Sequence, residues 1–249
     1  MKGTVMTEFH VLIPARLASQ RLKKKALLDI HGAPLVARVF ECAQRAQPKS
    51  VHVVTDSEAI GQAIEVIGGS VVMTSPDHRS GTDRLCEAVT HLALRDEDIV
   101  VNLQGDEPMM PVECLNQVAE VLAQNPAAEM ATLYEPLASE AQWQSPDVVK
   151  LVTTSSGHAL CFSRSPIPHP RNGGWPRAVA RRHVGLYAYR VDALKRWGTL
   201  PDSDIEAVEG LEQWRALTAG WSIVCARAVC PIPPGVDTQA DIDRVRLEW

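Results

Sequence analysis

The chain has 249 residues, of which 45% are hydrophobic and 22% are charged, and its formal net charge is −5. A chain of this length and composition can bury a complete hydrophobic core, so we expect a single domain over residues 1–249. The acidic balance argues against a general nucleic-acid or membrane-surface binder, and any cluster of lysine and arginine needs a local explanation.

The first half of the chain alternates short β-rich runs with helical patterns. The predicted elements are a strand at 9–14, a helix at 34–46, a strand at 51–55, a helix at 57–66, a strand at 70–73, a helix at 81–93, a strand at 98–103 and a helix at 111–123. This alternation is typical of βαβ units, so we expect an α/β fold with a mostly parallel sheet. The run at 98–103 is apolar almost throughout, as a central strand would be.

The second half is less regular and indicates a mixture of helices and strands. It contains predicted strands at 129–133, 148–153, 158–162, 183–190 and 222–226, a helix near 206–219, and a final helix from about 238. The segment 169–181 is rich in proline, glycine and arginine and has no periodicity. We expect it to be a mobile loop beside the functional site.

The six cysteines form no close pair and have no histidine at the spacing of a zinc site, which is typical of reduced thiols. The first residues lack the apolar segment of a signal peptide. No apolar run reaches the roughly 18 residues that a membrane helix requires. We therefore expect a cytoplasmic protein without a membrane partner.

A cluster of cations follows the first predicted strand: Arg16, Arg21 and Lys25, with Ser19 between them. Open α/β sheets bind their ligands at the carboxyl ends of strands, and arginine and lysine are the side chains that neutralise phosphate. This loop therefore indicates a phosphate site. The alternative is a solvated surface cluster.

Two carboxylates stand at positions that suit a metal ion. Asp106 follows the most apolar strand in Q-G-D-E-P, and Asp237 precedes the final helix in P-P-G-V-D-T. Mg²⁺ prefers oxygen ligands and shares its coordination shell with substrate phosphates. An ordinary turn at 104–108 and a helix cap at Asp237 or Thr238 are the simpler alternatives. If the fold brings the two aspartates together, a metal–phosphate ligand would fit between them and the cationic loop.

A third segment, S-P-D-H-R-S-G-T-D-R at 75–84, runs from a short strand into a helix. Its backbone N–H groups and hydroxyls suit a base or a phosphate, although a serine cap and a surface histidine at His78 would explain it as well. The glycine-rich fingerprints of dinucleotide and P-loop proteins are absent from the sequence, as is a nucleophile elbow. Phosphate binding must therefore rely on side-chain cations and a metal.

Together these motifs resemble one family, the CMP-Kdo synthetases, or 3-deoxy-manno-octulosonate cytidylyltransferases. The similarity runs nearly end to end and includes I-P-A-R-L-A-S-Q-R-L at 13–22, V-V-T-D at 53–56, M-T-S-P-D-H-R-S-G-T-D-R at 73–84, V-N-L-Q-G-D-E-P at 101–108, V-V-K at 148–150, A-L-C-F-S-R-S-P-I-P at 159–168, R-H-V-G-L-Y-A-Y-R at 182–190, L-E-Q-W-R at 211–215 and P-G-V-D-T at 234–238. Several of these look like the Kdo branch of the group and not like the related CMP-sialic acid synthetases.

The resemblance implies transfer of CMP from CTP to Kdo, with Mg²⁺ as cofactor, for lipopolysaccharide biosynthesis. It also implies a Rossmann-like three-layer fold, and a homodimer held by a small β-rich region at about 160–190 that also binds sugar. The implied nucleotide-binding residues are Pro14, Ala15, Arg16, Ser19, Arg21, Lys25, Ser80, Gly81, Arg84 and Asp106; the metal ligands are Asp106 and Asp237; and the sugar-acid pocket is formed by Gln104, Arg164, His183, Tyr187, Glu212 and Gln213. Arg16, Lys25, Asp106 and Asp237 would carry catalysis, and Arg164 would pair with the sugar carboxylate.

One loop departs from the family pattern. Where the family reads R-L-P-G-K-P-L, this chain has R-L-K-K-K-A-L, so Lys23, Lys24 and Ala26 replace the two prolines and the glycine. Since proline and glycine preset backbone dihedrals, we expect weaker preorganisation and a higher CTP requirement. Lys24 would be strained if the glycine it replaces has positive φ. Two alternatives stay open: a cytidylyltransferase for another 2-keto sugar acid, and a homologue with impaired catalysis.

Overall fold

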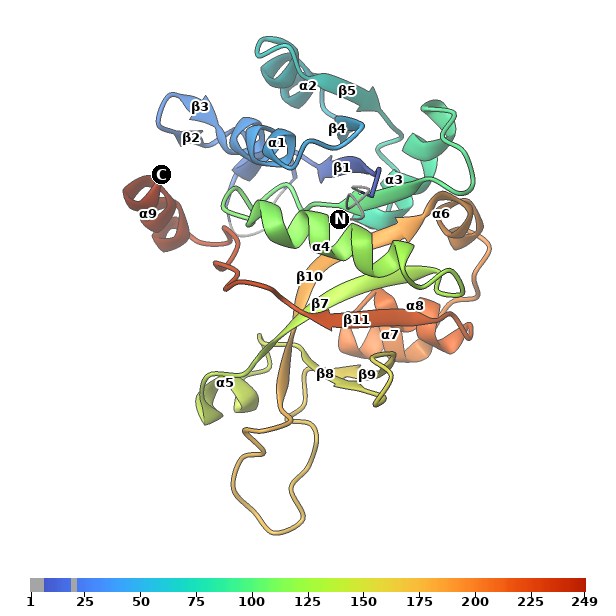
Figure 1. Ribbon diagram of the computed structural model, residues 1–249. Coiled ribbons are helices and arrows are strands. Elements are labelled where there is room, and N and C mark those ends of the chain that lie inside the picture. Colours follow the sequence, from blue (N-terminus) through green and yellow to red (C-terminus); the bar gives the residue numbers. More distant parts are fainter. Residues whose placement is uncertain (1–6, 19–21) are drawn as a thin grey trace, which may run out of the picture.

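The computed structural model describes residues 7–18 and 22–249. Their main element is a nine-stranded sheet (Figure 1) with the order β11, β7, β10, β6, β1, β4 and β5, to which β8 and β9 are attached at β10. The strands of the sheet are β1 (His10–Ala15), β4 (Ser50–Thr55), β5 (Ser70–Met73), β6 (Ile99–Asn102), β7 (Met130–Pro136), β8 (Lys150–Thr153), β9 (Ala159–Ser163), β10 (Arg181–Arg190) and β11 (Ile223–Arg227).

The sheet is mostly parallel, which confirms the predicted fold class. β1 pairs in parallel with β4 and β6, β4 with β5, and β11 with β7. Along the path from β11 to β5, β10 is the exception, because it runs antiparallel to β6 and β7 and lies between them. The attached strand β8 is also antiparallel to its neighbours β10 and β9. A separate hairpin of β2 (Asp29–Ile30) and β3 (Ala33–Pro34) follows the short 3-10 helix η1 (Lys25–Leu27).

Helices cover both faces of the sheet and make a three-layer molecule. The helices are α1 (Leu35–Arg45), α2 (Glu58–Glu65), α3 (Gly81–His91), α4 (Val112–Ala123), α5 (Glu140–Gln144), α6 (Val191–Trp197), α7 (Asp204–Glu209), α8 (Gln213–Thr218) and α9 (Gln239–Glu248). The buried side chains of α1, α2 and α4 belong to one hydrophobic cluster, and those of α3, α6 and α8 belong to another. No helix among the described residues is both long and apolar enough to cross a bilayer.

The central strands separate these two clusters through the period of the β-strand. Val11 and Ile13 of β1 lie in the first cluster, and Leu12 between them lies in the second. Successive side chains of a strand point to opposite faces, so a strand covered on both sides must be apolar throughout. Because β1 and β6 pair in parallel, their carboxyl ends lie at the same edge of the sheet.

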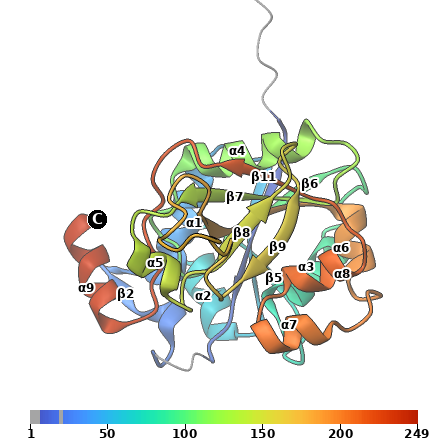
Figure 2. The ribbon, with the colours of Figure 1, turned by 90° about the horizontal axis from the view of Figure 1, so that it is seen from below.

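An arm projects from the body (Figures 1 and 2) and carries β8, β9, α5 and the loop that leads into β10. A small cluster of Leu137, Trp143 and Ala180 is buried inside it. The loop 169–181 lies on this arm, and its residues are not among those that line the cavities described below. The prediction that this loop lies beside the site is therefore wrong for the single chain.

The element boundaries agree closely with the sequence patterns in the first half and less well in the second. The helix predicted near 206–219 is two helices, because Gly210 takes the left-handed conformation, with φ of 62°, and ends α7. The short helices α5 and α6 are too brief for a periodic signal to reveal them.

Candidate active site

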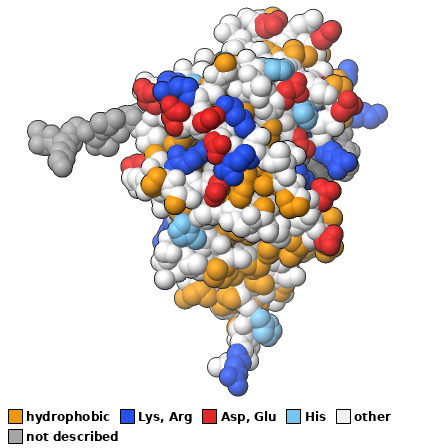
Figure 3. Space-filling model, turned by 90° about the vertical axis from the view of Figure 1, so that its right-hand side faces the viewer, with side chains coloured by type: hydrophobic (Ala, Val, Ile, Leu, Met, Phe, Trp, Pro, Cys, Tyr) orange, Lys and Arg blue, Asp and Glu red, His pale blue; other side chains and the backbone are white. Residues whose placement is uncertain are grey.

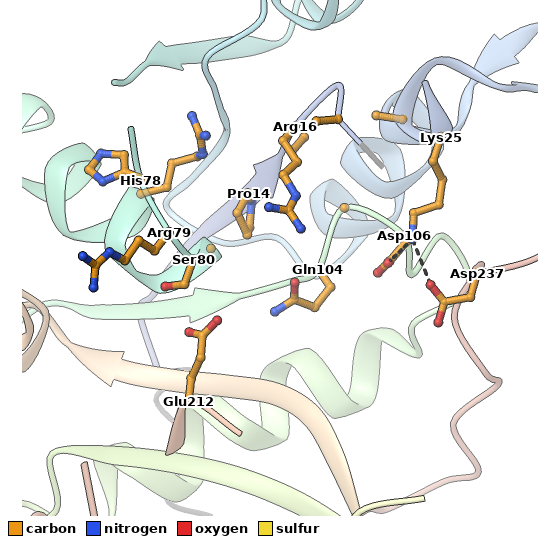
Figure 4. A pocket seen from close by; sticks show the side chains of 16 residues that line it. Pro14, Arg16, Lys25, His78, Arg79, Ser80, Gln104, Asp106, Glu212 and Asp237 are labelled. Atoms are coloured by element: carbon orange, nitrogen blue, oxygen red, sulfur yellow. Dashed lines mark hydrogen bonds and ion pairs between the residues drawn. The ribbon is translucent and has the colours of Figure 1, made fainter. Parts of the chain in front are cut away.

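Two adjoining cavities open where β1 and β6 end, and Figure 4 shows the larger of them. The larger has a volume of about 440 Å³, and its wall includes Pro14, Ala15, Arg16, Lys25, His78, Arg79, Ser80, Gly81, Arg84, Gln104, Gly105, Asp106, Glu212 and Asp237. The smaller has a volume of about 270 Å³ and is lined by Gly81, Thr82, Asn102, Gln104, His183, Gly185, Tyr187, Tyr189, Gly210, Leu211, Glu212 and Gln213. Gly81, Gln104 and Glu212 belong to both walls, so the two cavities adjoin each other.

The larger cavity contains a cation held between two carboxylates. The Lys25 ammonium donates to Asp106 Oδ2 at 2.6 Å, to Asp237 Oδ1 at 3.1 Å and to the carbonyl of Val236 at 2.9 Å (Figure 4). Burial alone would lower the pKa of Lys25, but the charges and hydrogen bonds of the two aspartates raise it above its usual value. The fold thus brings Asp106 and Asp237 to one positive charge.

Asp237 is not the cap of the final helix. Thr238 is the N-cap of α9 and forms a capping box with Asp241. This local arrangement leaves the Asp237 side chain directed toward Lys25 instead of the helix terminus (Figure 4). The structure therefore contains both features that the sequence offered as alternatives. Thr238 caps the helix, and Asp237 shares the Lys25 ammonium with Asp106.

Two glycines allow the segments of this cavity to approach one another. A Cβ at Gly105 would stand 2.8 Å from the carbonyl oxygen of Pro14, which is closer than real Cβ atoms come. A Cβ at Gly235 would stand 3.4 Å from the carbonyl oxygen of Asp106, and the N–H of Val236 donates to that same oxygen at 2.8 Å. Close backbone contacts therefore set the distance between the strand ends and the chain around Asp237.

Glu107, next to Asp106, is a buried carboxyl that the sequence did not single out, and it lines neither cavity. Its Oε2 is buried and has no hydrogen-bond partner among the described residues. Burial, together with the charges of Asp106 and Asp237, raises the pKa of this carboxyl to about 8, although Arg182 opposes the rise. Its position beside Asp106 in Q-G-D-E-P was the only available signal.

The segment 75–84 forms the opposite wall of the larger cavity. Ser80 is the N-cap of α3, and its hydroxyl accepts the N–H of Asp83 at 3.1 Å. The side chain of Arg84 is almost completely buried, donates to Thr74 Oγ1 at 2.6 Å and pairs with Asp56 at 3.3 Å. Ser80 therefore both caps α3 and lines the larger cavity.

Two further side chains complete that cavity. His78 lies 2.5 Å from Glu87, Nε2 to Oε2, and also lines the cavity, so it is more than a surface histidine. Figure 4 shows the Arg16 guanidinium reaching into the cavity on the side of Gln104. Ser19 and Arg21, predicted for the same loop, lie outside the described residues.

The smaller cavity is polar and partly unsatisfied. Asn102 Oδ1, the hydroxyl of Tyr187 and Gln213 Nε2 are buried, and none has a hydrogen-bond partner among the described residues. Buried polar groups are almost always paired in folded proteins, so three such atoms in one wall indicate a ligand rich in hydroxyl groups or water. Asn102 was not predicted, although an asparagine in an otherwise apolar strand was a signal.

Burial shifts the pKa values of two further residues of the smaller cavity, His183 and Glu212. Burial lowers the pKa of His183 to about 3, so its imidazole is neutral, and its Nε2 lies 3.1 Å from Thr132 Oγ1. Burial also raises the pKa of Glu212, which accepts a hydrogen bond from Thr82 Oγ1 at 2.7 Å. Both side chains were predicted here and both line the cavity.

Arg164 is the one predicted sugar-pocket residue that lines neither cavity. Its Nε donates to the carbonyl of Glu209 at 2.7 Å, and its Nη1 donates to the carbonyl of Pro146 at 2.9 Å. The carboxylate of Glu209 in turn accepts the N–H of Arg164 at 2.9 Å. In this conformation Arg164 supports the chain that leads to Glu212, and its pairing with a sugar carboxylate stays a prediction.

The backbone of Lys24, in the altered loop before Lys25, has the positive φ at which strain is expected. Lys24 has φ of 52° and ψ of 39°, in the left-handed region that favours glycine. Lys25 then begins η1, whose short turn carries the ammonium to the carboxylates. Lys25 therefore reaches Asp106 through a turn whose preceding residue, Lys24, has a strained backbone.

Comparison with known proteins agrees with this geometry. A family model described as "Cytidylyltransferase" matches residues 10–223. A 3-deoxy-manno-octulosonate cytidylyltransferase of Cellvibrio japonicus (strain Ueda107) is 46% identical, with 96% of each chain covered, and one of Francisella philomiragia is 44% identical, with 97% of this chain and 98% of the relative covered.

Solved structures are similar as well. A CMP:2-keto-3-deoxy-manno-octonic acid synthetase complexed with CTP superposes with a TM-score of 0.89 at 42% identity, over 97% of this chain and 98% of that one. A 4-diphosphocytidyl-2C-methyl-D-erythritol synthase, 16% identical with a TM-score of 0.64, shares the fold. The chain belongs to the cytidylyltransferase family and, within it, to the 3-deoxy-manno-octulosonate cytidylyltransferases.

Proposed function

We propose that this protein transfers CMP from CTP to Kdo, giving CMP-Kdo and pyrophosphate for lipopolysaccharide biosynthesis. The observation that carries the proposal is the pair of adjoining cavities: one is lined by cations and carboxylates, and the other by buried polar atoms without a hydrogen-bond partner among the described residues. A triphosphate and a polyhydroxylated acid are the ligands that these two walls suit. The names of relatives with 42–46% identity favour Kdo over other 2-keto sugar acids.

In the proposed reaction, the anomeric hydroxyl of the sugar forms a bond to the α-phosphorus of CTP while the bond to pyrophosphate breaks. Negative charge develops on the phosphate oxygens, and fixed cations in a partly enclosed site stabilise it. Arg16 and Lys25 reach the cavity from one side, and Arg84 reaches it from the other. The backbone N–H groups at the start of α3, at Gly81, suit a phosphate or the nucleotide.

Asp106 and Asp237 are the proposed ligands of Mg²⁺. Their fit to a cation is supported by the Lys25 ammonium, which both carboxylates contact, at 2.6 and 3.1 Å. The described residues hold no group of three or more His, Cys, Asp or Glu that could bind a metal alone. Mg²⁺ commonly takes one or two carboxylates from the protein and completes its shell with water and substrate phosphates. A metal there would offset phosphate charge and lower the pKa of the attacking hydroxyl.

We further propose that the protein is a cytoplasmic homodimer that uses the arm as its interface. Leu160 and Val179, at the base of the arm and in its loop, expose 58% and 53% of their surface. Figure 3 shows hydrophobic side chains gathered on the part of the molecule nearest the arm. An exposed apolar surface of this kind is typical of an interaction site.

The experiment that tests the proposed reaction is a pyrophosphate-release assay. Each nucleoside triphosphate is offered with Kdo, with its amino analogue and with a sialic acid, in the presence and absence of Mg²⁺. We expect release with CTP and Kdo, and only with the metal. No release with CTP and any of the three acids would reject the reaction, and preference for another acid would reassign the substrate.

A further inference from the structure

Glu135 and Arg182 form an ion pair that lies outside both cavities. They face each other in register across the antiparallel pair of β7 and β10. The Arg182 guanidinium donates to Glu135 Oε2 from Nε, at 3.0 Å, and also from Nη2. The two side chains are largely buried, with exposures of 27% for Arg182 and 18% for Glu135. A buried pair of this kind requires specific partners to offset its desolvation.

The partner of this pair is the main chain of Ile232, which it holds from both sides. Glu135 Oε1 accepts the N–H of Ile232 at 2.9 Å, and Arg182 Nη2 donates to the carbonyl of Ile232 at 3.3 Å. Hydrogen bonds to ionised groups are about twice as strong as those between neutral groups. We refer to these three residues as the Ile232 clamp.

The chain from Ile232 to Asp237 has little freedom to absorb a shift. Residues 233–234 are both proline, whose rings fix φ. The N–H of Val236 donates to the carbonyl of Asp106 at 2.8 Å, and its own carbonyl accepts from Lys25 at 2.9 Å. Between Ile232 and Val236 only Gly235 lacks a ring that fixes φ, so we expect a displacement of Ile232 to reach the carboxylate of Asp237.

We propose that Glu135 and Arg182 are positioning residues, which set the Asp237 carboxylate at the separation from Asp106 that a magnesium ion requires. This inference rests on the proposed metal role of the two aspartates. Mg²⁺ demands near-ideal octahedral geometry at about 2.0–2.1 Å, so a small displacement of one ligand weakens binding. Neither positioning residue contacts a substrate cavity; both act through the main chain of Ile232.

The test is Glu135→Gln, which keeps the shape of the side chain and removes its charge. We expect the Mg²⁺ concentration for half-maximal CMP transfer to rise about tenfold, the ratio produced by losing charge-assisted hydrogen bonds. The KM for Kdo and kcat at saturating metal should stay at the values of the unmodified enzyme. Binding of Mn²⁺ to the enzyme with CTP and no sugar, followed through the EPR signal of the free ion, should weaken by the same factor.

Asp98→Asn is the matched control. Asp98 also pairs with an arginine, Arg95, through two hydrogen bonds and accepts a main-chain N–H, but it lies at the amino end of β6, remote from Asp106. The Asp98→Asn enzyme should keep the Mg²⁺ requirement and the Mn²⁺ affinity of the unmodified enzyme. Unaltered Mn²⁺ affinity in folded Glu135→Gln, or an equal loss in the control, would overturn the positioning role while leaving the reaction intact.

A second variant covers the possibility that Glu135→Gln does not fold. Arg182→Lys keeps the charge and loses the planar fork, so a smaller shift of the same sign is expected. A folded Arg182→Lys enzyme with unchanged metal affinity would count against the clamp. If the unmodified enzyme transfers CMP without any metal, the clamp and the proposed metal site are both wrong, whereas the cytidylyltransferase reaction stands.

Discussion

The proposed reaction depends most strongly on the negative charges of Asp106 and Asp237. We expect Asp106→Asn and Asp237→Asn each to lower kcat by about a hundredfold or more, because a neutral amide neither balances a divalent ion nor holds Lys25. Circular dichroism should show an unchanged fold. Near-normal turnover in either folded variant would remove that residue from the metal site.

Asn102 is the residue for which burial makes the sharpest prediction about the sugar acid. Its Oδ1 is buried without a partner in the smaller cavity, so Asn102→Leu should raise the KM for Kdo about tenfold, the cost of one lost hydrogen bond to a hydroxyl. The KM for CTP should be unchanged. Asn116→Leu is the control, since Asn116 Oδ1 is also buried and unpaired but lies on α4, outside the cavity. Equal effects of the two substitutions would contradict a sugar contact.

Lys24 allows a test of whether the unusual loop costs nucleotide affinity. Because Lys24 has positive φ, the double substitution Lys23→Pro with Lys24→Gly should relieve about 1 kcal/mol of strain and lower the KM for CTP. Lys24→Ala, which removes the charge and keeps the strain, should not lower it. A KM for CTP that the double substitution leaves unchanged would show that the loop is adequately preorganised as it stands.

At the level of single residues, the sequence identified charged side chains that the fold brings together, but not the burial of the groups around them. Lys25, Asp106 and Asp237 could be predicted because charged residues followed apolar strands and turns in recognisable motifs. The unpaired state of Asn102 and the raised pKa of Glu107 could not, because both depend on burial by segments distant in the chain.

Among the elements, the turn after β6 is the one most tightly fixed by packing. A Cβ at Gly105 would stand 2.8 Å from a main-chain oxygen, so Gly105→Ala must move either β1 or the turn that carries Asp106. We expect a loss of about 1–3 kcal/mol in the free energy of unfolding, measured with urea, and reduced turnover. Gly198→Ala, with open space around its Cβ, is the control and should be neutral. Comparable stability of the two variants would contradict the close contact.

The main strands and helices of the first half were predictable because each is long enough to show its own period, whereas the short η1, β2 and β3 were not predicted. The strand at 70–73 and the helix beginning at 81 start where the pattern placed them. In the second half the pattern failed where conformation depended on one residue, as at Gly210, or where helices such as α5 were very short. The placement of β10 between β6 and β7 is a tertiary feature that no local pattern encodes.

For the whole molecule, the arm is the feature with the clearest testable consequence. If it forms the dimer interface, the unmodified protein should run as a dimer in light scattering coupled to size exclusion. The double substitution Leu160→Asp with Val179→Asp places charges on exposed apolar positions and should give a monomer. A monomeric unmodified protein, or a dimer that survives the substitutions, would exclude this interface.

In the proposed reaction, Lys25 would compete with the metal for the two aspartates. Its ammonium lies 2.6 Å from Asp106 and 3.1 Å from Asp237, so a divalent ion that binds both carboxylates would have to displace a tethered cation. A triphosphate would offer Lys25 another anionic partner and would so uncover the two aspartates. Nucleotide and metal binding would then be thermodynamically linked, each raising the affinity of the other by the same factor. Because of Lys25, the protein would bind the complex of metal and nucleotide more tightly than the free metal or the free nucleotide.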